Sequence, residues 1–457
     1  MAGQSFEGVR VLDLSSVWAA PYAVQFLAGN GADVIKVEHV TRPDFRLFGP
    51  FADDEPGERY WERSGTFNFL HRNKLGVTLN LREQARIDLF KDLVRISDVV
   101  VENYTPRVME QFGLQYAALQ EIRPDLIMLS FTGYGHTGPW SQYSAVGDAM
   151  EATCGFCEVT GYTDGPPMKA GYAYVDLIAS WYCALALAAA LEQRARTGQG
   201  QWLDVSMYEC GVSFLGDVLL EYQATGVQPP RMGNDHPWAA PHGCFPCLGH
   251  DQWVAISVFG DDQWLRLCTA MQRPDLAEDV RYADGLVRWR NRAALRETIQ
   301  EWTREREARA VMEALQAAGI PASPVFNNRD LLTNPHLAQR GYYQEVRHPE
   351  HTRLGRRLYP RPPFLFHNRE PKPSTPPPGI GEHNSEILGD LLGLDTGSVQ
   401  ATHQSGIAGD APASVESPFA TISLQALLEL GQIAGVDADY QEKLENVHSR
   451  SMRTPHR

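Results

Sequence analysis

The segment GVRVLDLSSVWAAPYAVQFLAGNGADVIKVE, residues 8–38, limits the fold of this chain more than any other feature. An apolar run rich in β-branched residues is followed by a loop, by a stretch of helical character and by a second apolar run at 34–37. Pro21 suits the first turn of a helix, and Gly29 and Gly31 end that helix. This order is that of a β-α-β unit, which requires parallel strands and a right-handed crossover.

The same alternation continues over the next hundred residues. Apolar runs at 76–81, 98–104 and 125–135 flank a helical stretch at 82–97. We therefore expect an α/β fold whose large domain is a doubly wound, Rossmann-like parallel sheet. Ligands of such sheets bind beyond the carboxyl ends of the strands, which here are the loops 15–20, 102–106 and 132–138. None of these loops is a GxGxxG motif, so a nicotinamide or flavin dinucleotide is not indicated.

Changes in composition divide the rest of the chain. A Pro-rich stretch at 228–243 reads as a linker, and a strand and helix pattern follows it as far as 319–327. We expect the large domain over 1–225, a smaller α/β domain over 226–330 and a return to the large domain over 331–395. The segment 396–457 is expected to be a flexible linker and tail with one short helix at 422–436.

Charge and cysteine content exclude several classes of function. The net charge of −15 argues against nucleic acid as the main partner. We find no apolar window of membrane-spanning length and no secretory signal, so we expect no membrane partner and a cytoplasmic location. The seven cysteines include two CxxC pairs, Cys154/Cys157 and Cys244/Cys247. The pairs lie far apart and the second falls in an expected hairpin, so buried or strand thiols are favoured over zinc.

A single carboxylate, Asp176, begins a long apolar segment in GYAYVDLIASW, residues 171–181. The run 176–195 is apolar all round and ends at RTGQGQ, which predicts a buried helix starting at Asp176. Aspartate is a favoured N-cap, so capping is the simpler interpretation. A helix N-terminus also stabilises a carboxylate nucleophile and donates N–H groups to charge on its adduct. Local sequence leaves both roles open.

Several segments together resemble the family III CoA-transferases. They are the 8–38 segment above, NKLGVTLNL, DVVVENYTPRVMEQFGL, RPDLIMLSFTGYGHTGPW, ALEQRARTGQGQWLDVSM and GIGEHNSEILGDLLGL. The likeness covers residues 6 to about 395, and the motifs occur in the family's order. It implies an acyl-CoA:carboxylate CoA-transferase with an acyl-CoA and a carboxylic acid as substrates and no tightly bound cofactor or metal. It also implies an interlocked homodimer in which each chain threads through its partner.

The resemblance assigns roles to particular residues. Asp176 would be the nucleophile that forms an aspartyl anhydride and then an aspartyl-CoA thioester, from which CoA passes to the acceptor acid. The positions implied for CoA binding are Val17, Trp18, Ala19, His39, Leu79, Asn80, Arg82, Asn103 and Tyr104. Basic residues that hold CoA in formyl-CoA transferase are replaced here by His39, Gln111 and Ser144. Arg42, Arg72, Lys74 or Arg107 are candidates to contact the phosphates instead, the alternative being ordinary solvated charges.

Two other functions stay open on the sequence. An acyl-CoA racemase of the same fold needs a positioned acid/base pair, but its histidine would fall at Gly147, which leaves His136 nearby. A subunit without chemistry of its own in a hetero-oligomer would have no need of Asp176. The glycine-rich loop of formyl-CoA transferase has no counterpart, which argues against formyl-CoA:oxalate chemistry. The aromatic residues Trp18, Tyr172, Tyr174, Trp181 and Tyr182 are candidates for an acyl pocket, although packing in the core is the simpler role.

Overall fold

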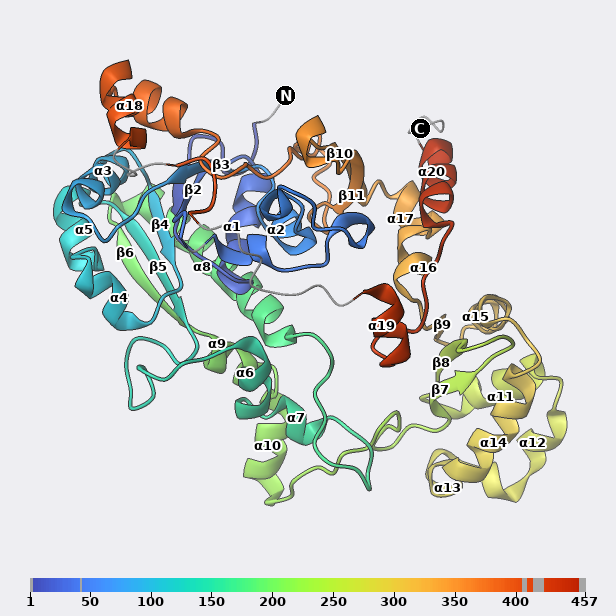
Figure 1. The fold of residues 1–457 in the computed structure, drawn as a ribbon. Helices are drawn as coiled ribbons and strands as arrows, with labels where there is room; N and C mark the ends of the chain where they lie inside the picture. The colour runs from blue at the N-terminus through green and yellow to red at the C-terminus, as the bar shows by residue number, and fades with distance from the viewer. Residues whose placement is uncertain (1–2, 42, 405–408, 414–422, 452–457) are drawn as a thin grey trace. The chain divides into compact units, whose positions relative to one another are not determined.

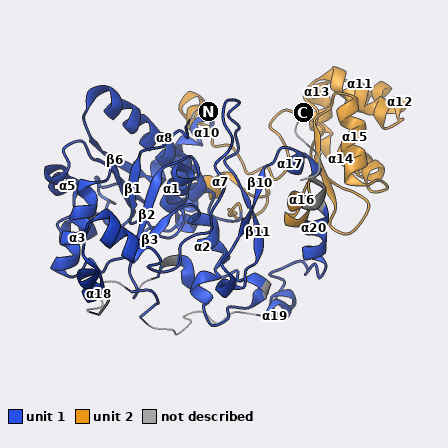
Figure 2. Cartoon of the chain, turned by 90° about the horizontal axis from the view of Figure 1, so that it is seen from above, with its two compact units in different colours: residues 1–155, 171–217, 335–457 blue, residues 156–170, 218–334 orange. Residues whose placement is uncertain are grey.

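A computed structural model describes residues 3–41, 43–404, 409–413 and 423–451 of the chain. It divides into two compact units, coloured separately in Figure 2, of which unit 1 comprises 1–155, 171–217 and 335–457 and unit 2 comprises 156–170 and 218–334. The sequence predicted boundaries near 225 and 330 but did not predict the short insert at 156–170. Parts of the expected flexible segment, 405–408 and 414–422, lie outside the described residues, as does Arg42.

A six-stranded parallel sheet forms the centre of unit 1 (Figure 1). Its strands are β1 Arg10–Asp13, β2 Asp33–Glu38, β3 Leu75–Thr78, β4 Val99–Glu102, β5 Ile127–Thr132 and β6 Gln201–Ser206. The order is β3-β2-β1-β4-β5-β6 and every neighbouring pair is parallel. The predicted α/β class with a doubly wound sheet is thus confirmed. The order reverses between β1 and β4, which is where ligands bind in such sheets.

Helices flank the sheet on both faces. The helices of unit 1 are α1 Ala19–Gly29, α2 Gly65–Leu70, α3 Gln84–Arg95, α4 Pro106–Gln111, α5 Tyr116–Ile122, α6 Gly147–Thr153, α8 Tyr174–Thr197, α9 Met207–Ser213, α17 Pro335–Gln339, α18 Thr396–Gln404, α19 Leu424–Glu429 and α20 Tyr440–Ser451. Short 3-10 or π turns occur at Asp44–Leu47, Ala52–Asp54, Tyr60–Glu62, Glu350–Thr352 and Glu386–Leu391. A hairpin of β10 Tyr343–Arg347 and β11 Arg356–Pro360 completes the unit. The predicted tail helix is α19, whereas α20 was not predicted and α18 lies where a flexible linker was expected.

Apolar side chains of the strands and helices form the main core of unit 1. Leu12, Ile35 and Val77 from adjacent strands are fully buried with Phe90 and Leu93 of α3. Burial on this scale is the main favourable term in folding, since each buried large apolar side chain contributes about 1.5–3 kcal/mol. The core therefore fixes the sheet and, with it, the positions of the strand ends.

Helix α8 is the long apolar helix that the sequence predicted, and it packs against α1. It ends at Gly198, which has a left-handed φ of 71° that suits glycine, after a last turn containing Arg194 and Arg196. By length and composition α8 is the one described helix that could cross a membrane, which differs from the expectation that no apolar stretch of that length occurs. The buried core helices of globular proteins can have the same length and apolar composition.

Unit 2 has its own core around a three-stranded antiparallel sheet in the order β7-β8-β9. Its strands are β7 His242–Pro246, β8 Trp253–Ser257 and β9 Ala322–Pro324. Its helices are α7 Phe156–Val159, α11 Asp261–Ala270, α12 Pro274–Glu278, α13 Gly285–Arg290, α14 Arg292–Thr303, α15 Ala308–Ala317 and α16 Asn328–Leu332, with a 3-10 turn at Val280–Tyr282 and α10 Gly216–Thr225 at the boundary. The expected hairpin around Cys244 and Cys247 is confirmed as β7–β8.

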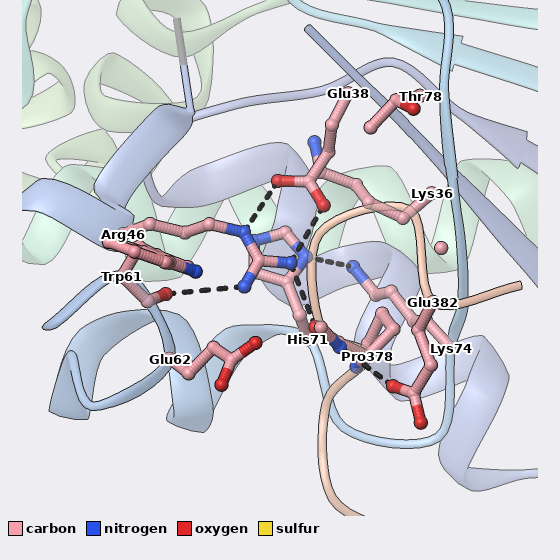
Figure 3. A network of polar contacts seen from close by, with 12 residues as sticks. Lys36, Glu38, Arg46, Trp61, Glu62, His71, Lys74, Thr78, Pro378 and Glu382 are labelled. Atoms are coloured by element: carbon pink, nitrogen blue, oxygen red, sulfur yellow. Dashed lines mark hydrogen bonds and ion pairs between the residues drawn. The ribbon is translucent and has the colours of Figure 1, made fainter. Parts of the chain in front are cut away.

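A chain of buried charges lies beside strands β1, β2 and β3, and Figure 3 shows its members Lys36, Glu38, Arg46, His71 and Lys74. Asp13, the last residue of β1, accepts a hydrogen bond from Lys74 Nζ at 2.8 Å, and both side chains are 0% exposed. Lys74 also lies 3.1 Å from His71 Nδ1. Burial alone would raise the pKa of Asp13, but Lys74 and Lys36 together lower it below the usual value, so Asp13 is ionised.

The same chain of charges continues along β2. Lys36 Nζ donates to the carbonyl of Ser15 in the loop after β1. Glu38, the last residue of β2, accepts two hydrogen bonds from the buried guanidinium of Arg46, at 2.8 and 2.7 Å. Arg46 lies 3.6 Å from the centre of the Phe67 ring and also donates to the carbonyls of Trp61 and Pro378. These contacts hold the loop after β1, the end of β2, the 3-10 turn Tyr60–Glu62 and the segment at Pro378 in one arrangement.

Removing Lys74 from its ion pair with Asp13 should destabilise unit 1 strongly. We expect Lys74→Met to lower the free energy of unfolding by about 3–5 kcal/mol, because Asp13 would be left buried without its partner. Arg95→Met is the matched control, since its ion pair with Asp92 is half exposed and such pairs contribute about 0–1 kcal/mol. Chemical denaturation followed by fluorescence measures both. A loss below about 1 kcal/mol for Lys74→Met would contradict this role of the pair.

Candidate functional site

The loops that follow β1 and β4 are tied together at the point where the strand order reverses. Asn103, directly after β4, accepts a hydrogen bond from the Ser16 backbone N–H at 2.8 Å and donates one to its carbonyl oxygen at 2.7 Å. Both loops were predicted as ligand-binding segments from their places in the sequence. An amide side chain paired with both backbone groups of one residue leaves the β1 loop little freedom to move relative to β4.

Val17, at the tip of the β1 loop, has an unusual backbone conformation. Its φ is 72°, in the left-handed region that β-branched residues rarely adopt. The Asn103 bonds to Ser16 hold the loop beside it, and Trp18 packs edge-to-face on Phe45 with ring centroids 6.1 Å apart. Backbone strain of this kind costs about 1–3 kcal/mol and is concentrated at functional sites. The conformation leaves the Val17 side chain 49% exposed.

A cavity of about 700 Å³ lies against these loops, a size suited to a small-molecule ligand. Its lining includes several residues predicted to bind CoA, namely Val17, His39, Leu79, Asn80, Arg82 and Tyr104. Two more predicted residues, Trp18 and Asn103, are next to lining residues in the chain, and Ala19 begins α1. The structure thus brings most of the predicted set together. Arg107 is exposed on α4 and is not among the lining residues.

The charges around the cavity differ from expectation. Arg72 and Lys74, expected as phosphate contacts or surface charges, are instead buried, because Arg72 donates to the carbonyl of Pro360 and Lys74 pairs with Asp13. Lys36 and Glu38 reach the cavity but belong to the buried chain of charges. Arg82 is an exposed cation of the lining. Spacing along the sequence cannot distinguish a buried cation from an exposed one, which is why these predictions failed.

Asp176 occupies the first turn of α8 and is 7% exposed. The helix begins at Tyr174 rather than at Asp176, so Asp176 is its third residue and not its N-cap. The N-cap is Ala173, which has no capping side chain. Ser180 Oγ lies 2.7 Å from the carbonyl oxygens of both Asp176 and Ala19, so α8 is fastened one turn below Asp176 to the start of α1. The capping interpretation of Asp176 is therefore wrong.

Helix α6 lies directly against the Asp176 carboxylate. A Cβ atom at Gly147, the first residue of α6, would be 1.6 Å from Asp176 Oδ2 and 2.5 Å from the Cβ of Ala173. No side chain fits there with Asp176 in this position. Farther along α6, Glu151 is fully buried and its Oε1 accepts a hydrogen bond from the Tyr174 N–H at 2.6 Å. No sequence signal singled out Glu151, which lies in an ordinary helical context.

A second buried acid stands at the end of β4. Glu102 Oε2 accepts the N–H of Tyr104 at 2.8 Å, and Oε1 lies 3.7 Å from His136 Nε2 in the loop after β5. Burial raises the pKa of Glu102 to about 7, and Asp204 adds to this rise. Burial also lowers the pKa of His136, although Asp204 and Glu110 oppose the change. A charged residue that ends the apolar run VVVE was the available signal for Glu102.

The aromatic residues proposed for an acyl pocket do not gather in one place. Trp181 packs edge-to-face against Tyr22 and Phe26 between α8 and α1, whereas Trp18 contacts Phe45. Tyr182 shares a hydrogen bond with Ser213. Among the described residues no group of three or more histidine, cysteine or acidic side chains is arranged to hold a metal ion.

Comparisons with known proteins agree on one family. The family model for CoA-transferase family III matches residues 6–384. Succinyl-CoA:mesaconate CoA-transferase of Haloarcula marismortui is 36% identical over 405 residues, which are 86% of this chain and 98% of that enzyme. Succinyl-CoA–D-citramalate CoA-transferase of Chloroflexus aurantiacus is 34% identical over 85% of this chain and 94% of its own. A solved CaiB/BaiF family protein from Brucella suis has a TM-score of 0.76 at 31% identity, covering 85% of this chain and 100% of its own.

The raised pKa of Glu102 should make stability depend on pH. Between pH 4.5 and about 7 the folded chain keeps a proton that the unfolded chain has released, so the free energy of unfolding falls as pH rises through this window. Glutamine at position 102 cannot ionise. We therefore expect the free energy of unfolding of Glu102→Gln, relative to that of wild type, to increase by about 3 kcal/mol between pH 4.5 and 7.5. Urea denaturation at four pH values measures the difference. If the difference in free energy of unfolding between Glu102→Gln and wild type stayed constant with pH, Glu102 would not hold a proton in the folded chain over this range.

Proposed function

This chain belongs to CoA-transferase family III, and we propose that it moves CoA from an acyl-CoA donor to a carboxylic acid through covalent intermediates on Asp176. The observation that carries the proposal is the placement of Asp176, a nearly buried carboxylate in the first turn of an apolar helix. A helix N-terminus directs backbone N–H groups at negative charge that develops beside it. Burial from water limits hydrolysis of a reactive acyl adduct.

The proposed reaction conserves all atoms and needs no net proton transfer. A carboxylate oxygen of Asp176 attacks the thioester carbonyl, the C–S bond breaks, and CoA thiolate leaves an aspartyl anhydride. The thiolate attacks the aspartyl carbonyl carbon, which releases the donor acid and leaves an aspartyl-CoA thioester. The acceptor carboxylate displaces the thiolate to form a second anhydride. The thiolate then attacks the acceptor's carbonyl carbon, which yields the new acyl-CoA and restores Asp176.

Gly147 favours transfer over racemisation. A racemase must remove the α-proton on one side of the carbon and return one on the other, so it needs a positioned acid/base group beside the carboxylate. At position 147 even a Cβ would overlap Asp176 Oδ2. His136 faces Glu102 instead, at 3.7 Å. Transfer through anhydrides requires no such acid/base group, so the geometry around Asp176 suits it better.

For CoA itself we propose the cavity of about 700 Å³ beyond β1, β2 and β4. It is lined by Val17, His39, Leu79, Asn80, Arg82 and Tyr104. Arg82 is exposed and can pair with a phosphate, and Arg107 on nearby α4 is a second exposed cation. The names of the relatives suggest short dicarboxylic acids, with succinyl-CoA as the first donor to test.

We propose that the enzyme is an interlocked homodimer located in the cytoplasm. The support in this chain is the partial exposure of large apolar residues of α8, since Trp181, Tyr182 and Leu185 are 39%, 39% and 66% exposed. Large apolar groups gathered on one helix of a globular protein mark a protein interface.

Light scattering should therefore give twice the mass of one 457-residue chain at micromolar concentration. Leu185→Asp places a charge in the proposed interface and should cause unfolding or aggregation, because interlocked chains cannot separate while folded, whereas Glu192→Asp on the polar end of α8 should leave the mass unchanged. A wild-type mass equal to one chain would contradict the dimer.

Trapping the covalent intermediate tests the reaction. After incubation with succinyl-CoA and hydroxylamine, we expect a mass change at Asp176 in wild type and none in Asp176→Ala, whose CoA transfer falls at least about 10³-fold. Arg82→Ala is the matched control for binding, and it should still form the adduct with a KM for acyl-CoA raised about 5- to 10-fold. A protein that transfers CoA without modification of Asp176 would overturn the mechanism. Exchange of the α-proton of a 2-methylacyl-CoA without transfer would instead identify a racemase.

A further inference from the structure

We propose that Glu151 is a positioning residue that holds the first turn of α8, and with it the Asp176 carboxylate, in the reactive arrangement. The proposal rests on the proposed function of Asp176 as nucleophile. It concerns a residue of α6 that contacts α8 through one hydrogen bond, the 2.6 Å bond between Glu151 Oε1 and the Tyr174 N–H.

The N–H groups in the first turn of α8 need a hydrogen-bond acceptor from elsewhere in the chain. The first N–H groups of any helix have no acceptor within the helix, and a capping side chain normally satisfies one of them. Ala173 stands at the N-cap and cannot do so. Glu151 satisfies the first of these N–H groups, that of Tyr174, with a carboxylate oxygen. A negative charge at a helix N-terminus also interacts favourably with the helix dipole.

Asp176 lies two residues beyond that bond. Its own N–H is bonded to Ala173 O at 3.1 Å, so the single turn 173–176 carries both the cap and the carboxylate. If the Glu151 bond were lost, this turn could fray, because helix ends open more easily than helix interiors. A nucleophile displaced by about 1 Å from its attack position loses up to about 100-fold in rate. The bond therefore affects the chemical step more than the binding of CoA.

Helix α6 contacts α8 at a second point, and both points lie on one face. Gly147 and Glu151 are four residues apart, so they are neighbours on the helix surface. Gly147 lies against Asp176 Oδ2, where no Cβ would fit, while Glu151 holds Tyr174. Glycine lets the two helices approach, and glutamate fixes the register between them. Together they define where the carboxylate stands.

Burial of the Glu151 carboxylate destabilises the folded state, and the protein nevertheless keeps this acid in place. The side chain is 0% exposed, and its Oε2 has no hydrogen-bond partner among the described residues. A buried carboxylate with one unpaired oxygen is destabilising by itself. A neutral apolar residue on α6 would stabilise the core better, so the acid is explained by what its other oxygen does for α8.

The test compares three variants in kinetics and in amide hydrogen exchange. Glu151→Ala removes the acceptor, and we expect kcat to fall about 10- to 100-fold while the KM for acyl-CoA changes less than about threefold. Glu151→Gln keeps an oxygen at the same place and should restore kcat to within about threefold of wild type. Glu192→Ala, the same substitution at an exposed site near the other end of α8, should match wild type.

Hydrogen exchange followed by mass spectrometry reports on the helix turn without any need for activity. The peptide covering 174–180 should exchange at least about tenfold faster in Glu151→Ala and at the wild-type rate in Glu151→Gln. Equal rates for all three variants, or a Glu151→Gln enzyme as slow as Glu151→Ala, would overturn the proposal. A wild-type enzyme that transfers no CoA would overturn the proposed function alone, since the exchange rates still decide whether Glu151 holds the turn.

Discussion

The buried ion pair between Asp13 and Lys74 determines how the functional edge of the sheet is built. Asp13 is the last residue of β1 and Lys74 precedes β3, so the pair connects the carboxyl end of a central strand with the amino end of an edge strand. On the neighbouring strand β2, Lys36 donates to the Ser15 carbonyl and Glu38 pairs with Arg46, a pair that Figure 3 shows. Charges without access to water must be compensated by fixed partners, so the loops that carry them cannot adopt alternative positions without a large cost. The cavity beside them is consequently formed before any ligand arrives.

The two acids near Asp176 and at the end of β4 illustrate different uses of a buried carboxyl group. Glu102 takes up a proton near neutrality because burial disfavours its charge. Glu151 instead accepts a backbone N–H at the start of a helix, where the dipole favours a negative charge. Both hold a backbone segment next to a predicted ligand residue, Tyr104 in one case and Asp176 in the other. Internal acids thus help to fix these two segments, as the Asn103 amide fixes the loop after β1.

The sequence predicted the sheet well because the information is local. Residues 8–38 specify a β-α-β unit by their apolar periodicity and their glycine positions, and parallel strands then require that the loops meet at one edge. The cavity residues Val17, Asn80 and Tyr104 were predicted by the resemblance and lie at that edge. The contact of Gly147 with Asp176 could not be predicted, since it depends on how α6 and α8 approach each other. The expectation that Arg72 and Lys74 contact phosphates or are solvated charges was also wrong, because their burial results from partners some 290 and 60 residues away.

The edge of the sheet at β3 is completed by a segment made much later in synthesis. Gly76 exchanges hydrogen bonds with His383, and the Thr78 N–H is bonded to Asn384. About 300 residues separate these partners, so at a ribosomal rate of about 5–20 residues per second the edge waits roughly 15–60 s for its cover. During that interval β3 presents unpaired backbone groups of the kind that promote pairing between chains. Production of this protein is therefore sensitive to how fast it is translated and to which chaperones are at hand.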